Sequence, residues 1–127
     1  LRSDERVISR EQFNCRNLTP DDVNEAPTIV VGDVSFISLT KILGAAAQVI
    51  AADGDFVMLI KPQFELQREQ IGKGGIVRDP VLHQQAIDKI DSFARDTVGI
   101  HPQGVIPSPI EGAAGNREFL AWYKAPC

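Results

Sequence analysis

The stretch IVVGDVSFISLTKILGAAAQVIAADGDFVMLIK, residues 29–61, decides the fold of this chain. It opens with a continuous β-branched run, which is the pattern of a strand covered on both faces in a parallel sheet. A helix can begin at Ser38 or Thr40, because both residues cap well and apolar residues recur after them at helical spacing. The run FVMLIK, residues 56–61, predicts a second buried strand, and Pro62 stops its simple continuation. Residues 29–61 therefore predict a parallel βαβ unit.

Further elements are predicted on both sides of this unit. The sequence RVISRE, residues 6–11, predicts a short strand ahead of it. A second helix is predicted over residues 79–97, where Gly99 ends it. GVIPSPI, residues 104–110, and REFLAWYKA, residues 117–125, predict an antiparallel hairpin whose first strand lies at a sheet edge, because it contains two prolines. Together these elements predict an α/β fold with a mostly parallel sheet and a C-terminal antiparallel hairpin.

Composition limits the kind of protein that this chain can be. Its 127 residues, 43% hydrophobic and 24% charged, fit one globular domain of ordinary size. The net charge of -4 argues against a protein held on nucleic acid by bulk charge, although it leaves room for a local basic patch. No apolar run approaches the roughly 20 residues that span a bilayer, and two cysteines are too few for a disulfide scaffold. We expect a cytoplasmic protein with no membrane partner, and its oligomeric state stays open.

Charged side chains follow both strands of the predicted βαβ unit. In open α/β sheets, ligands gather at the carboxyl ends of the strands. Asp33 follows the first strand and Lys61 the second, so an acid and an amine should lie side by side there, each favouring the charged form of the other. Phe36 and Phe64, in the turns that follow, could stack on a flat ligand such as a nucleobase. The alternatives are a structural ion pair and two rings that fill the core.

The segment 63–79 is polar, rich in glycine and long for a connection in a compact domain, which is typical of a functional loop. Its cations Arg68, Lys73 and Arg78 could contact a polynucleotide backbone. The interleaved acids and the lack of a Walker A context slightly favour the alternative, an ordinary solvated loop. Neither histidine of the chain has a partner at metal-ligand spacing, so we predict no metal site.

Four blocks of the sequence resemble one known family. DVSFISLTKIL, IKPQFE, GKGGIVRDPVLHQQAI and SPIEGAAGNREFLAWYK are similar to the TlyA-type hemolysin family, a branch of the FtsJ-like ribosomal RNA ribose methyltransferases. The blocks follow one another in the family's order and run along nearly the whole chain. The resemblance implies a Rossmann-like methyltransferase sheet. It also implies transfer of a methyl group from S-adenosylmethionine to a ribose 2′-hydroxyl of ribosomal RNA.

The resemblance also assigns roles to individual residues. Members of this family use a tetrad of lysine, aspartate, lysine and glutamate, whose last three members match Asp33, Lys61 and Glu118. It implies that the segment after the first strand here contacts the adenine and that the turn after the next strand contacts the methionine end of the cofactor. The implied cofactor contacts are Asn14, Asp33, Val34, Ser35 and Phe36.

Several features of the family match nothing in residues 1–127. These are the glycine-rich cofactor strand, the first lysine of the tetrad and a small N-terminal RNA-binding domain. We therefore expect residues 1–127 to be the C-terminal part of an FtsJ-like methyltransferase domain that lacks its N-terminal strands. Such a fragment should be inactive alone.

Three other functions are compatible with the sequence. The chain could hold RNA without chemistry, or it could be a membrane-active hemolysin, although its predicted helices have core-like faces with few cations. It could also methylate a base, because DVSF loosely resembles the strand-end motifs of amino-group methyltransferases. Lys61 separates the two enzymatic alternatives. A ribose methyltransferase needs this lysine, whereas an enzyme that methylates an exocyclic amine requires only polar acceptors.

Overall fold

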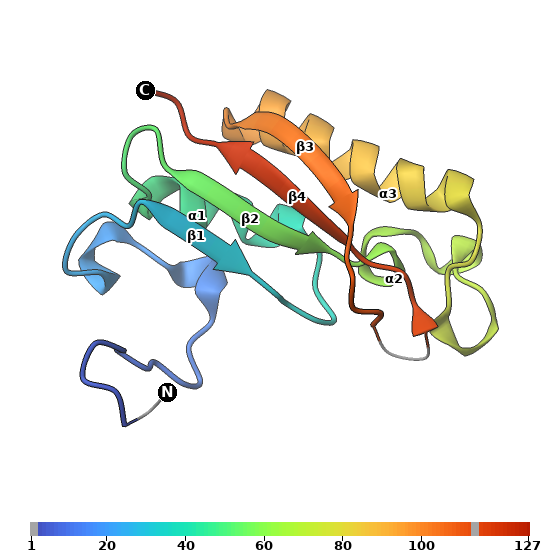
Figure 1. The fold of residues 1–127 in the computed structure, drawn as a ribbon, viewed down its shortest axis with the longest axis horizontal. Helices are drawn as coiled ribbons and strands as arrows, with labels where there is room; N and C mark the ends of the chain where they lie inside the picture. Colours follow the sequence, from blue (N-terminus) through green and yellow to red (C-terminus); the bar gives the residue numbers. More distant parts are fainter. Residues whose placement is uncertain (1–2, 113–114) are drawn as a thin grey trace.

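A four-stranded mixed sheet organises the computed structural model, which describes residues 3–112 and 115–127 (Figure 1). Its strand order is β1-β2-β4-β3. Strands β1 and β2 are parallel, and β4 is antiparallel to both of its neighbours, β2 and β3. The α/β fold and the C-terminal hairpin are thus confirmed. The sheet is mixed rather than mostly parallel, because β4 makes antiparallel pairings on both of its sides and leaves β1–β2 as the one parallel pairing among the described strands. The strands are β1 (Ile29–Gly32), β2 (Asp55–Ile60), β3 (His101–Pro107) and β4 (Phe119–Lys124).

Helices begin where the sequence places capping residues. Ser38 accepts a hydrogen bond from the Thr40 amide and starts a 3-10 turn that leads into α1. The Asp79 carboxylate accepts from the Val81 amide at the start of α3, and Gly99 adopts a left-handed conformation, with φ at 85°, where the helical chain ends. The helices are α1 (Leu43–Val49), α2 (Pro62–Glu65) and α3 (Pro80–Phe93).

The strand predicted over residues 6–11 is wrong. The Asp4 carboxylate accepts hydrogen bonds from the backbone amide and guanidinium of Arg6, and the Val7 amide bonds to the Asp4 carbonyl. These contacts close a local turn. A β-rich sequence forms a strand only beside another strand, and none of the described residues ahead of β1 is in a strand. Val7 and Ile8 are consequently exposed.

The prolines of β3 lie where they cost the sheet little. This strand is at the edge of the sheet, as predicted, and it pairs only with β4 among the described strands. The pairing register shifts between Pro102 and Gly104. Because proline lacks an N–H donor, it is tolerated at a sheet edge or at a bulge.

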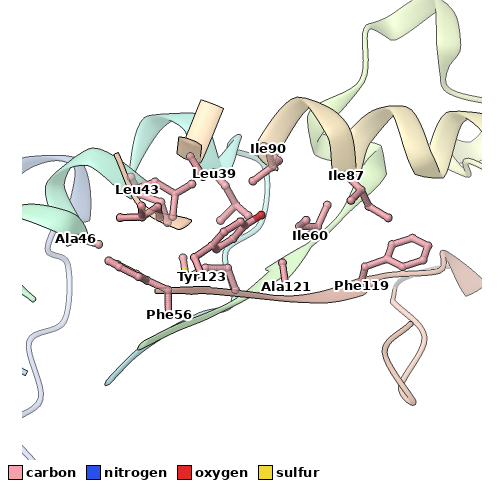
Figure 2. Packing of buried hydrophobic residues seen from close by; sticks show 14 of the residues in the cluster. Leu39, Leu43, Ala46, Phe56, Ile60, Ile87, Ile90, Phe119, Ala121 and Tyr123 are labelled. Carbon is pink, nitrogen blue, oxygen red and sulfur yellow. The ribbon is translucent and has the colours of Figure 1, made fainter. Parts of the chain in front are cut away.

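One face of the sheet packs against α1 and α3 and forms the core. Figure 2 shows the apolar side chains of β2 and β4 pointing toward these helices. Alternate residues of β2, such as Phe56 and Ile60, are fully buried there, and so is Tyr123 of β4. Burying one such side chain contributes about 1.5–3 kcal/mol to folding.

The opposite face of the sheet is uncovered in the described structure. Its apolar side chains include Ile29, Val31, Ile106 and Trp122, all of which are exposed. The prediction that the first strand of the βαβ unit is covered on both faces is therefore wrong for Ile29 and Val31. Burial alternates along the strands because only one face meets helices.

Tyr123 ties the sheet to α3 through a buried hydroxyl. Its hydroxyl donates to Asp91 Oδ1 at 2.8 Å. Burial of the ring is the main cause that raises the pKa of this phenol far above its ordinary value, and the hydrogen bond to Asp91 adds to the shift. The folded chain therefore keeps Tyr123 protonated.

We expect this phenol to make the 127-residue chain lose stability in alkali. The group's pKa is raised on folding, so its contribution is fully present below the unfolded value of about 10 and falls as the pH rises above it. Tyr123 is the one tyrosine of the chain, so tyrosinate absorbance should appear only as the chain unfolds. Urea denaturation across pH 7–12 tests this, with Tyr123→Phe as the comparison. The free energy of unfolding of that variant should be about 1 kcal/mol lower at neutral pH and should fall less steeply in alkali. An equally steep fall in both proteins would show that Tyr123 is not the cause of the alkaline loss.

Candidate active site

Asp33 and Lys61 meet at the carboxyl ends of β1 and β2. The two strands are parallel neighbours, so the residues that follow them leave the sheet at the same edge (Figure 1). Lys61 Nζ lies 2.6 Å from Asp33 Oδ1 and donates to Ser35 Oγ at 3.0 Å. The lysine side chain is only 11% exposed, whereas the aspartate side chain is 71% exposed. The structure thus brings together the acid and the amine that strand order predicts.

Phe36 projects into solvent from the turn after β1. Its backbone adopts a left-handed conformation, with φ at 62°, which costs about 1–2 kcal/mol for a residue with a side chain. The residue is 90% exposed, and its ring centroid lies 5.0 Å from that of Phe64. Phe36 is therefore not a core residue. Val34, two residues earlier, packs against the core instead.

Glu118 reaches the same edge from the opposite chain direction. It lies immediately ahead of β4, which runs antiparallel to β2. Its carboxylate accepts a hydrogen bond from Gln63 Nε2 at 3.1 Å, and the residue is only 6% exposed. Gly112 approaches so closely that a side chain there would collide with this carboxylate. Glu118 is thus held in a tight buried setting.

A cleft of about 800 Å³ joins these groups. Asp33, Ser35 and Phe36 line it together with Lys61 and Glu118. Val57, Leu59 and Leu120 contribute apolar walls from the uncovered sheet face, and residues 108–112 line it from the turn between β3 and β4. Its volume is that of a small-molecule site.

Comparison with known protein families decides the identity of this fold. The family model of FtsJ-like methyltransferases matches residues 1–125. The chain belongs to the FtsJ-like methyltransferase family. Its mixed sheet, with the antiparallel β4 between β2 and β3, belongs to an α/β methyltransferase fold.

Named relatives of this FtsJ-like chain come from several bacteria. The 16S/23S rRNA (cytidine-2'-O)-methyltransferase TlyA of Mycobacterium tuberculosis is 40% identical over 124 residues, which are 98% of this chain and 46% of the relative. Hemolysin A of Brachyspira hyodysenteriae is 41% identical over 124 residues, which are 97% of this chain and 51% of the relative. The chain therefore spans about half the length of these relatives.

Solved structures agree with the family assignment. A proposed hemolysin from Streptococcus thermophilus superposes with a TM-score of 0.95 at 45% identity, covering 99% of this chain and 46% of that one. A SAM-dependent methyltransferase from Methanosarcina mazei gives a TM-score of 0.53 at 11% identity, covering 90% of this chain and 65% of that one. The second match shows the fold alone.

Other residues predicted for the site lie outside the cleft of this FtsJ-like chain. Asn14 is exposed and caps a 3-10 turn, with its side chain accepting from the Arg16 amide. Arg68, Lys73 and Arg78 are exposed on the segment that follows α2. None of these four predicted contacts is among the described residues that line the cleft. Their roles stay predictions.

Asn116 fastens the glycine-rich segment to the turn that precedes β4. Its Oδ1 accepts from the Val77 amide and its Nδ2 donates to the Gly75 carbonyl, both at 2.9 Å. Asn116 is buried, and His83 contacts the Val77 carbonyl from α3. The segment is thus anchored near the site. Sequence patterns gave no signal for this anchor, nor for Gln63.

Two findings are negative for the part of the chain that the structure describes. Within residues 3–112 and 115–127, no three side chains of histidine, cysteine, aspartate or glutamate converge as metal ligands. None of the helices there combines the length and the apolar composition that a bilayer crossing requires.

Proposed function

We propose that the protein transfers a methyl group from S-adenosylmethionine to a ribose 2′-hydroxyl of ribosomal RNA. The observation that carries the proposal is the Lys61–Asp33 ion pair inside the cleft, because this FtsJ-like chain joins an amine and an acid at its strand ends. The M. tuberculosis relative is named for this reaction on cytidine. Such a substrate would place the protein in the cytoplasm.

The cleft residues fit S-adenosylmethionine, which supplies an electrophilic methyl group when bound. The Asp33 carboxylate suits the cationic end of the cofactor. Gln63 Oε1 is buried and has no hydrogen-bond partner among the described residues, so it offers an acceptor to a ligand N–H or O–H. The apolar walls suit a flat ring system. Of the predicted cofactor contacts, Asp33, Ser35 and Phe36 line this cleft, whereas Val34 and Asn14 do not. All five cofactor contacts stay predictions.

Lys61 would orient the ribose hydroxyl. An ammonium has three N–H donors, and Asp33 and Ser35 accept from two directions here. The remaining donor can hold the hydroxyl oxygen in line for attack and stabilise negative charge that develops on it. Glu118 adds a buried carboxylate whose position Gln63 fixes. It can accept the proton of the ribose hydroxyl, either directly or through an ordered water.

RNA would approach over the aromatic rim of the cleft. Phe36 presents its ring to solvent and the half-buried Phe64 lies against it, and an exposed ring stacks on any nucleobase with about 1–3 kcal/mol. Arg68, Lys73 and Arg78 would contact backbone phosphates from the exposed segment beside α3. Shape and stacking, rather than net charge, would then provide most of the recognition.

Transfer of labelled methyl groups tests this proposal. The protein, at the full length that its gene encodes, is incubated with labelled S-adenosylmethionine and unmethylated ribosomal RNA, both naked and in subunits. The RNA is then digested to nucleosides. We expect label in 2′-O-methylated ribose. Label in a base would indicate the amino-group reaction, and no label on any substrate would favour an RNA-binding or membrane-active protein without chemistry.

A further inference from the structure

A second buried carboxylate lies beside the site but outside the cleft. Glu65 is the last residue of α2 and is only 5% exposed. It is not among the described residues that line the cleft. Burying a charged carboxylate costs free energy unless it is paired and hydrogen-bonded. The partners of Glu65 therefore indicate its role.

Glu65 joins three elements of the fold. Ser38 Oγ donates to its Oε1 at 2.5 Å, and the Leu39 amide donates to its Oε2 at 2.9 Å. Lys89 of α3 lies 3.4 Å from Oε1 and donates to the Glu65 backbone carbonyl at 2.6 Å. One carboxylate therefore ties the turn after β1 to the turn after β2, and α3 secures both.

The two tied turns are the ones that carry the site. Ser38 lies two residues after Phe36 and five after Asp33, while Glu65 lies one residue after Phe64 and four after Lys61. The bond between Ser38 and Glu65 thus closes a ring of contacts that also contains the ion pair and the aromatic pair. A shift of one turn relative to the other would change both pairs together.

We propose that Glu65 is a positioning residue, which sets the distance from Asp33 to Lys61 and from Phe36 to Phe64 without touching substrate. This inference rests on the proposed methyl transfer. A displacement of about 1 Å at a reacting group can cost up to 10²-fold in rate. Loss of Glu65 should therefore lower kcat, while the apolar cleft walls from the sheet, which Glu65 does not contact, keep the KM for the cofactor nearly constant.

Glu65→Gln is the most informative variant, because it keeps the size of the side chain. Its amide nitrogen would face either the Leu39 N–H, or the Lys89 ammonium together with the Ser38 hydroxyl. In each case an N–H donor meets another donor, so at least one of the contacts of Glu65 is lost. We expect kcat to fall on the order of 10-fold to 100-fold, with the KM for the cofactor within a factor of about three. Glu69→Gln is the matched control, because it removes the same charge from an exposed residue of the same segment and should leave kcat unchanged.

If Glu65→Gln does not fold, Ser38→Ala provides the test. It removes one of the three links to Glu65, together with the hydrogen bond that Ser38 accepts from the Thr40 amide. We expect a smaller fall in kcat, with an unchanged circular dichroism spectrum. An unchanged kcat in Glu65→Gln, or in Ser38→Ala when the first variant is unfolded, would overturn the inference. A fall in melting temperature alone, with kcat per folded molecule unchanged, would show a purely structural role and overturn it as well.

Hydrogen exchange separates this inference from the proposed function. Lys61→Ala is assayed alongside, and its loss of activity is the check on the methyl-transfer proposal. If wild-type protein transfers no methyl group, amide exchange over residues 33–39 decides instead. Faster exchange there in Glu65→Gln, with α3 unaffected, supports the positioning role, whereas equal protection in both proteins overturns it.

Discussion

Methyl transfer falls by about 10²- to 10⁴-fold when Lys61 is replaced by alanine, if its ammonium orients the ribose hydroxyl and stabilises charge there. The side chain is largely buried, pairs with Asp33 and points into the cleft. Alanine leaves the attacking oxygen without this donor. Single-turnover transfer of labelled methyl groups to unmethylated ribosomal RNA measures the effect, with the full-length protein in excess.

Stability should change little in this variant. The Asp33 side chain that loses its partner is 71% exposed, and such pairs contribute only about 0–1 kcal/mol. Lys41→Ala, which removes an exposed lysine from the turn ahead of α1, should keep full activity. Lys61→Arg retains the charge but not the compact geometry of the amine, so it should stay strongly impaired. Activity of Lys61→Ala within twofold of wild type would remove Lys61 from the mechanism.

Gly112→Ala should damage the site through Glu118. An added Cβ at position 112 would lie 2.6 Å from Glu118 Cδ and nearer still to its Oε2. Either the turn or the buried carboxylate must move, and a moved carboxylate would leave Gln63 without its acceptor. We expect about 10²-fold lower kcat and a loss of about 1–3 kcal/mol in the free energy of unfolding.

Gly104→Ala is the matched control, because a Cβ there meets no atom within 4 Å. It should leave both kcat and stability near wild type. A double variant tests whether Gly112→Ala lowers kcat through Glu118. Gly112→Ala combined with Glu118→Ala should have the same kcat as Glu118→Ala alone, because the effects of neighbouring changes that act through one group do not add. Additive losses would show that Gly112 acts independently of Glu118.

Elements that depend on local chemistry could be predicted from the sequence. Pro62 ended β2, Gly99 ended the helical chain and Ser38 capped its turn, because each effect needs only a few neighbouring residues. The strand over residues 6–11 failed because pairing needs a partner that lies elsewhere. The exposure of one face of β1 could not be predicted for the same reason, because β-branched residues indicate a strand but not what covers it.

The same distinction applies to the site. Asp33 and Lys61 could be placed together, because parallel neighbouring strands end at one edge. Gln63 and Glu118 are 55 positions apart and meet only through the antiparallel β4, and Glu65 bonds to Leu39 across 26 positions. No spacing rule indicates that a buried glutamate at the end of a short helix holds two turns together.

The position of β4 has a consequence for synthesis. A ribosome makes the chain from its N-terminus, so β1, β2 and β3 are all complete before residues 119–124 exist. Because β4 lies between β2 and β3, the edges of β2 and β3 that pair with β4 stay unpaired until β4 has been made. Exposed edges of this kind invite contact with other chains. The site includes Glu118, which directly precedes β4, so it can form only after β4 has been made.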